Sequence, residues 1–153
     1  MRQARAAPEG DAARVLPAHL ESNFISRDYA GAQPVACLRS PRVALDALHR
    51  SEGRRVRPEH EDRHAYDGDD VLREIAAAAP DVGIVTLAPE IDGAIELIQW
   101  LVDRGHRVSL GHSGATYEET MAAAAAGARQ ATHLFNRMPP LNHRSPGLAG
   151  AVL

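Results

Sequence analysis

The chain has 153 residues, of which 24% are charged and 44% hydrophobic, and its formal net charge is −3. This length fits one domain with a modest core and is short for a complete (β/α)₈ barrel, which needs roughly 250 residues. The mildly acidic balance argues against a nucleic-acid partner. The sequence contains no apolar run long enough to span a membrane, so we expect no membrane partner. The single cysteine, Cys37, cannot form an internal disulfide, so we expect a cytoplasmic protein.

The first 70 residues carry the weaker patterns. Residues 1–14 show no period and predict a frayed amino terminus. Residues 15–21 are compatible with a short strand, which Pro17 restricts to a sheet edge or a strand beginning. Ser40 and Pro41 predict a short helix through His49. Segment 39–69 is otherwise poorly patterned. Its charged part, 50–70, resembles a solvated insertion, in which no apolar face supports a helical metal pair at His60 and His64.

From residue 69 onward the patterns are regular. Asp69 or Asp70 can cap a helix over 71–79, and a buried strand follows at 81–88. An apolar stripe predicts a helix over 91–104, and strand 107–110 comes next. The capping box Thr116-x-x-Glu119 opens a helix through Ala126, Gly127 closes it, and strand 130–134 completes the unit. This alternation predicts right-handed crossovers and a parallel sheet, with the tail 136–150 as a long loop rather than a helix.

Two histidines follow consecutive strands of this sheet. His112 comes after strand 107–110, and His133 stands at the end of strand 130–134. Neighbouring strands lie about 4.8 Å apart, so side chains at their carboxyl ends can converge on one ion. The alternative is that one or both histidines only hydrogen-bond backbone at a sheet edge. A catalytic zinc-like site needs a third ligand.

Glu21 is our first candidate for the third ligand, since it also ends a predicted strand and shares a face with His19. It could equally be an exposed glutamate at the start of a loop. Glu90 is a rival, or it favours the amino end of the next helix through the helix dipole. Further along, Asn136, His143 and Arg144 suit a phosphate or a carboxylate, although loop arginines are usually only solvated.

Five motifs resemble one family, the N-acetylglucosamine-6-phosphate deacetylases of the amidohydrolase superfamily, over residues 15–38 and 70–153. They read His19-Leu-Glu21, Thr86-Leu-Ala-Pro-Glu90, Gly111-His112-Ser-Gly-Ala-Thr116, Ala131-Thr-His133-Leu-Phe-Asn136-Arg-Met138 and His143-Arg144-Ser-Pro-Gly147-Leu-Ala-Gly150. The resemblance implies a TIM-type (β/α)₈ barrel that hydrolyses the acetamide of N-acetylglucosamine 6-phosphate to glucosamine 6-phosphate and acetate. It also implies an amino-sugar phosphate as the small-molecule partner, and a homodimer as one assembly to test.

The same resemblance assigns roles to individual residues. The implied metal ligands are Glu21, His112 and His133, for Zn²⁺ first and for Fe²⁺ or another divalent ion as alternatives. The implied substrate contacts are Ala32, Asn136, the backbone around Arg137, and Arg144. Glu90 is left with a structural role.

Departures from the family pattern lead to an expectation of incompleteness. Ser22-Asn23 stands where the family has Gly-Pro, and Gln33 stands where it has a histidine. The family's aspartate base and a substrate histidine follow the Gly-Leu-Ala-Gly motif, so we expect them beyond Leu153. We therefore expect residues 15–153 to form a partial barrel domain, with amino-terminal and carboxy-terminal parts missing and with impaired turnover. The alternatives are a non-catalytic phosphosugar- or metal-binding fragment and a truncated gene product.

Overall fold

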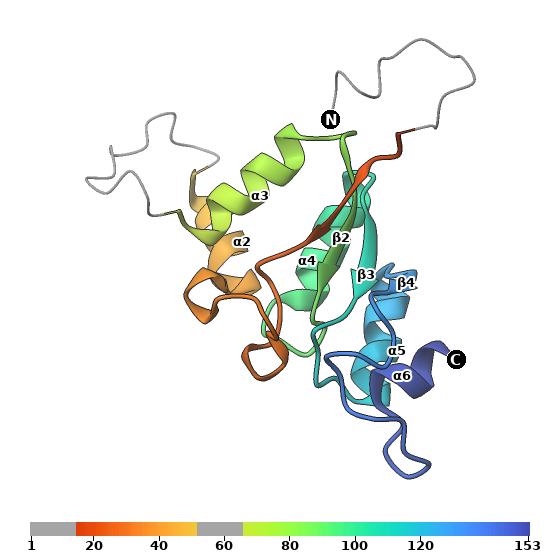
Figure 1. Cartoon of the computed structure of the whole chain (residues 1–153). Helices are drawn as coiled ribbons and strands as arrows, with labels where there is room; N and C mark the ends of the chain where they lie inside the picture. Colours follow the sequence, from red (N-terminus) through yellow and green to blue (C-terminus); the bar gives the residue numbers. More distant parts are fainter. Residues whose placement is uncertain (1–14, 52–65) are drawn as a thin grey trace.

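A four-stranded parallel sheet is the centre of the computed structural model, which describes residues 15–51 and 66–153 (Figure 1). Its strands lie side by side in chain order: β1 (Ala18–Glu21), β2 (Val82–Leu87), β3 (Arg107–Leu110) and β4 (Gln130–Ala131). The predicted parallel sheet is therefore confirmed, and β1 lies at the edge where Pro17 restricts it. The predicted frayed start and the pair His60 and His64 lie outside the described residues.

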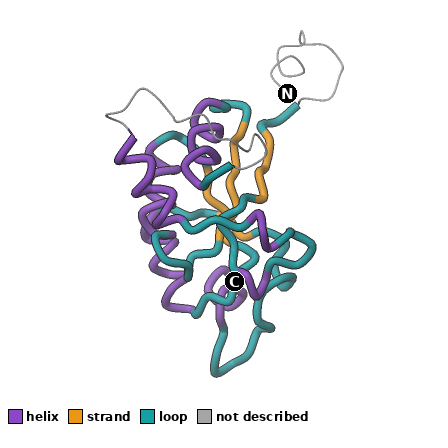
Figure 2. The backbone as a smooth tube through the Cα atoms, turned by 90° about the vertical axis from the view of Figure 1, so that its left-hand side faces the viewer, coloured by secondary structure: helices purple, strands orange, loops and turns teal. Residues whose placement is uncertain are grey.

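Helices connect the strands, as parallel pairing requires. They are α2 (Pro41–Ser51), α3 (Gly68–Ala77), α4 (Ala94–Asp103), α5 (Tyr117–Ala126) and α6 (Gly147–Val152). Two 3₁₀ turns, η1 (Arg27–Tyr29) and η2 (Val35–Cys37), lie in the loop after β1. In Figure 2 the long helices lie on one side of the strands. None of the helices in the described part of the chain has the length and apolar character that crossing a membrane requires.

The register gives the sheet two different faces. Leu20, Val85 and Val108 are paired across β1, β2 and β3. Val85 and Val108 belong to the hydrophobic core with the helices, and the partly buried Leu20 packs against it. That core includes the fully buried side chains Phe24, Leu72, Leu97, Ile98, Leu101 and Leu148. The alternate positions Glu21, Thr86 and Ser109 are also paired and share the opposite face. This opposite face is polar and carries the candidate site at its carboxyl end.

Hydroxyl groups connect the strands on the polar face. Thr132 Oγ1 lies 2.7 Å from both Thr86 Oγ1 and Ser109 Oγ, and His19 Nε2 lies 2.6 Å from Thr86 Oγ1. The segments that directly follow β3 and β4 approach closely here. A Cβ on Gly111 would lie only 2.9 Å from the Cβ of Thr132. Glycine at 111 therefore allows the close approach of the segments that carry the two histidines.

Several predicted boundaries were wrong. Strand β4 covers only Gln130–Ala131 rather than 130–134, because the backbone at His133 turns into the left-handed region. The predicted loop 136–150 contains the start of α6, and Leu148 of this helix is buried in the hydrophobic core. Helix α3 begins at Gly68 with Asp67 as its cap, and Asp70 Oδ2 accepts a hydrogen bond of 3.0 Å from the Asp67 amide. Both ends of the charged segment 50–70 are therefore helical.

Candidate metal centre

Three predicted ligands converge at the carboxyl end of the sheet. Glu21 ends β1, His112 follows β3 and His133 follows β4. Glu21 Oε1 lies 2.8 Å from His112 Nε2 and 3.1 Å from His133 Nε2, and the two Nε2 atoms are 3.0 Å apart. Ligands that share one zinc-like ion lie about 3.3 Å apart. The three atoms therefore need to separate by only a few tenths of an ångström to hold such an ion.

The hydrogen bonds of both imidazoles direct their Nε2 atoms toward this centre. His112 Nδ1 lies 2.7 Å from the carbonyl oxygen of Tyr29, and His133 Nδ1 lies 3.0 Å from that of Asn136. A carbonyl oxygen only accepts, so each Nδ1 must carry a proton and donate it. In the neutral imidazoles both Nε2 lone pairs then face the Glu21 carboxylate. A metal ion can bind the lone pairs of all three atoms at once, whereas one added proton can form a hydrogen bond between only two of them.

Both histidines adopt unusual backbone conformations. The φ angle is 50° at His112 and 32° at His133, and Phe135 and Arg137 also have positive φ values of 72° and 55°. Side chains other than glycine rarely adopt this region, and each such residue costs of order 1–3 kcal/mol. Strain of this kind is typical of functional sites, where surrounding contacts maintain it.

The cluster is closed on one side and open on the other. The side chain of His112 is 6% exposed, whereas those of His133 and Glu21 are 32% and 39% exposed. Burial raises the pKa of Glu21, but the hydrogen bonds and charge that His112 and His133 supply when protonated outweigh burial and hold the pKa below its usual value. Glu21 is therefore ionised at neutral pH and can act as an anionic ligand. Gln33, in place of the expected family histidine, donates from Nε2 to Glu21 Oε2 at 3.4 Å.

Three predicted substrate contacts lie close to the cluster. The amide of Asn136 donates to the carbonyl oxygen of His133 at 2.9 Å. The side chain of Arg137 lies against Gly31, where an added Cβ would be 2.7 Å from Arg137 Nε. Since Ala32 follows Gly31, the structure brings the first and last loops of the sheet together.

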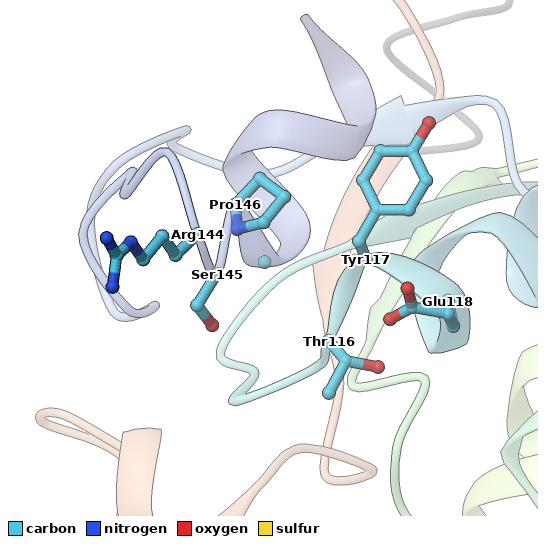
Figure 3. A pocket seen from close by; sticks show the side chains of 7 residues that line it. Thr116, Tyr117, Glu118, Arg144, Ser145 and Pro146 are labelled. Atoms are coloured by element: carbon cyan, nitrogen blue, oxygen red, sulfur yellow. The ribbon is translucent and has the colours of Figure 1, made fainter.

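Arg144 lies elsewhere, beside the start of α5. It lines a hollow of about 280 Å³ with Thr116, Tyr117, Glu118, Ser145, Pro146 and Gly147. In Figure 3 its guanidinium points away from Tyr117 and Glu118. The lining of this hollow includes none of the other predicted site residues.

Glu90, the predicted rival ligand, is used differently. Its carboxylate accepts hydrogen bonds from Ser113 Oγ at 2.7 Å and from the amide of Gly114 at 2.6 Å. It thus holds the loop after His112 instead of facing the cluster. The sequence gives no local signal for this contact, or for the Tyr29 carbonyl that orients His112, because the partners are 23 to 83 residues apart.

A parallel sheet with helices on one face and a Glu-His-His cluster at its carboxyl end is the arrangement of part of a TIM-type barrel, in which functional residues lie at that end. No protein-family model matches the chain. Curated relatives and solved structures do, and they show that it is homologous to part of the N-acetylglucosamine-6-phosphate deacetylases.

The matches cover nearly all of this chain and a minor part of each relative. The N-acetylglucosamine-6-phosphate deacetylase of Rattus norvegicus is 44% identical over 142 residues, which are 92% of this chain and 29% of the relative. That of Lysinibacillus sphaericus is 34% identical over 146 residues, 95% of this chain and 31% of the relative. The chain thus spans about 30% of the length of these relatives.

Solved structures agree with the partial-barrel prediction. The deacetylase of Pasteurella multocida superposes with a TM-score of 0.66 at 28% identity, over 91% of this chain and 30% of that one. A mutant of the Mycobacterium smegmatis deacetylase, in complex with N-acetyl-D-glucosamine-6-phosphate, has a TM-score of 0.52 at 26% identity, over 95% and 51% of the two chains. The predicted fold class is confirmed.

Proposed function

We propose that this chain supplies the metal centre and part of the substrate site for hydrolysis of N-acetylglucosamine 6-phosphate to glucosamine 6-phosphate and acetate. The observation that carries the proposal is the convergence of Glu21, His112 and His133 within about 3 Å of one another. The names of the relatives and the substrate in the Mycobacterium smegmatis complex support the choice of sugar phosphate.

In this proposal Glu21, His112 and His133 hold a divalent ion. One carboxylate and two imidazoles suit Zn²⁺, and Fe²⁺ or another divalent ion can use the same donors. A bound ion supplies Lewis acidity toward the amide carbonyl and lowers the pKa of water. The buried His112 fixes one side of the centre, while the exposed sides of Glu21 and His133 leave room for the acetamide.

The loop residues bind the phosphate in this proposal. Arg137 and Arg144 offer guanidinium groups, and Asn136 offers a side-chain amide. The Arg137 side chain lies against Gly31 in the loop after β1, whereas Arg144 lines the hollow beside the start of α5. Ala32, next to Gly31, lies at the same edge and contacts the sugar. A cytoplasmic location and a homodimer remain predictions.

Zinc-dependent binding and acetate release test the proposal. We expect the 153-residue chain to bind N-acetylglucosamine 6-phosphate only when Zn²⁺ is present, by isothermal titration calorimetry. Acetate release should be slow beside a full-length deacetylase assayed in parallel, and Glu21→Ala should abolish it. N-Acetylglucosamine without phosphate should bind more weakly, which tests the arginine contacts. Absence of zinc-dependent binding would overturn the proposal, and a rate equal to the full-length enzyme would refute the expected impairment.

Binding without turnover is the second candidate function. One observation favours it: among the described residues, the cluster contains a single carboxylate, Glu21, and this carboxylate faces both histidines. No second carboxylate of the described residues is placed there to move a proton. Binding of Zn²⁺ and sugar phosphate with no acetate released over many hours would support this candidate, whereas slow release that disappears in Glu21→Ala would exclude it.

A further inference from the structure

We propose that Glu90 is a positioning residue that holds His112 in its metal-binding conformation by clamping the two residues that follow it. This inference rests on the proposed metal centre. Glu90 is three residues beyond the end of β2, whereas the clamped residues Ser113 and Gly114 follow β3. The clamp therefore joins two loops at the carboxyl edge of the sheet.

The contacts use both oxygens of the Glu90 carboxylate. Oε2 accepts from Ser113 Oγ at 2.7 Å, and Oε1 accepts from the amide of Gly114 at 2.6 Å. Ser113 is fully buried, and its Oγ also accepts from the amide of Ala115 at 3.0 Å. The hydroxyl proton is thus committed to Glu90. Hydrogen bonds to an ionised carboxylate are roughly twice as strong as neutral ones.

The clamp acts where the backbone is strained. His112 has a φ of 50°, directly before the clamped residues. Backbone bonds hold the flanks: Ser26 donates to the carbonyl oxygen of His112 at 3.0 Å, and the amide of Ser113 donates to the carbonyl oxygen of Arg137 at 3.1 Å. Without Glu90, the Ser113 hydroxyl and the Gly114 amide lose their acceptor. The His112 backbone can then relax toward negative φ, which moves Nε2 away from the cluster.

The two donors of the clamp match a carboxylate. One O–H and one N–H point at two separate oxygens of Glu90. A glutamine of the same shape has one acceptor oxygen and one NH₂ group, so the Gly114 amide keeps its acceptor only if Ser113 Oγ accepts from the NH₂ group instead of donating. Glu90→Gln therefore replaces the charge-assisted bonds of the clamp by weaker neutral ones with almost no change in volume, which separates positioning from packing.

The experiment compares metal binding by the parent chain, Glu90→Gln and the control Glu96→Gln. Glu96 undergoes the same chemical change on the surface of α4, where its carboxylate pairs with Arg42. Zinc affinity is measured by competition with a chromophoric chelator, and coordination geometry by the visible absorption of bound Co²⁺. We expect about a tenfold loss of zinc affinity in Glu90→Gln, in the range that outer contacts of metal ligands show. Its Co²⁺ bands should shift, and Glu96→Gln should match the parent.

Circular dichroism and the urea midpoint show whether each variant is folded. If Glu90→Gln does not fold, Ser113→Ala removes one bond of the clamp, leaves Gly114 bound, and should give a smaller affinity loss with a Co²⁺ shift in the same direction. Unchanged zinc affinity and an unchanged Co²⁺ spectrum in the folded variant would overturn the inference about Glu90 but not the proposed metal centre. A parent chain that binds neither ion would overturn the metal centre and this inference together.

Discussion

The residues of the cluster differ from the other polar side chains of the sheet, because their hydrogen bonds leave several lone pairs without a donor. His112 and His133 each donate from Nδ1 to a backbone carbonyl, so the remaining lone pairs meet at Glu21. The hydroxyls of Thr86, Ser109 and Thr132, by contrast, can act as donor and acceptor among themselves. The hydroxyl network is therefore complete without a cation, whereas the cluster is completed by one.

His133→Ala should lower zinc affinity by more than about 100-fold, because loss of a ligand exceeds the 10- to 100-fold effect of losing an outer contact. Chelator competition measures it. His143→Ala is the matched control, since His143 is an exposed histidine of the following loop. Equal affinities for the two variants would show that His133 is not a ligand.

The approach of β3 to β4 gives a prediction at the scale of elements. Gly111→Ala places a Cβ 2.9 Å from the Cβ of Thr132. We expect a destabilisation of about 1–3 kcal/mol, typical of overpacking, together with weaker zinc binding because His112 is the next residue. Urea unfolding and chelator competition measure the two effects.

Thr116→Ala provides the control for that experiment. Thr116 caps α5 by accepting from the amide of Glu119 at 3.2 Å, and its loss should cost about 1 kcal/mol. Because the cap lies outside the cluster, zinc affinity should not change. Equal losses of zinc affinity in both variants would mean that global stability, and not the β3–β4 contact, controls binding.

The contact between α2 and α4 should depend on pH. Arg42 lies 2.6 Å from Glu96 and 3.4 Å from Asp92, and its hydrogen bond and charge hold the pKa of Glu96 below the usual 4.5. A lowered folded pKa means that the pair stabilises the fold above pH 4.5 and that this contribution disappears as the pH falls below it. Parent and Glu96→Gln should thus differ slightly in unfolding free energy at pH 7 and coincide near pH 3. A difference that persists at pH 3 would contradict this.

For the molecule as a whole, the strands and helices between residue 69 and β4 could be predicted from the sequence. The apolar stripe of helix 94–103 and the capping box at Thr116 are local patterns. Glu21, His112 and His133 could be predicted as ligands because each lies at the end of a predicted strand or directly after one. Helix α6 has only six residues, two of them glycine, which leaves no period to detect. The Glu90 clamp could not be predicted either, because it depends on how two loops meet in space.

Metal binding should stabilise the entire sheet. The cluster joins the ends of β1, β3 and β4, so an ion that binds only the folded chain adds about 2.7 kcal/mol at a concentration 100 times its dissociation constant. We expect Zn²⁺ to raise the urea midpoint and a chelator to reverse the shift. Glu21→Gln should reduce the shift strongly. A midpoint that does not respond to Zn²⁺ would exclude binding at this cluster.

The order of the strands also has a consequence for biosynthesis. Strands β1 to β4 are adjacent in space in the order in which the ribosome makes them, and Glu21 precedes His133 by 112 residues. The helical crossovers can form during elongation, since folding proceeds from the amino terminus. The third proposed ligand, His133, however, follows β4. A nascent chain that ends before β4 therefore lacks one of the three proposed ligands, and tight metal binding has to wait for β4 and the loop after it.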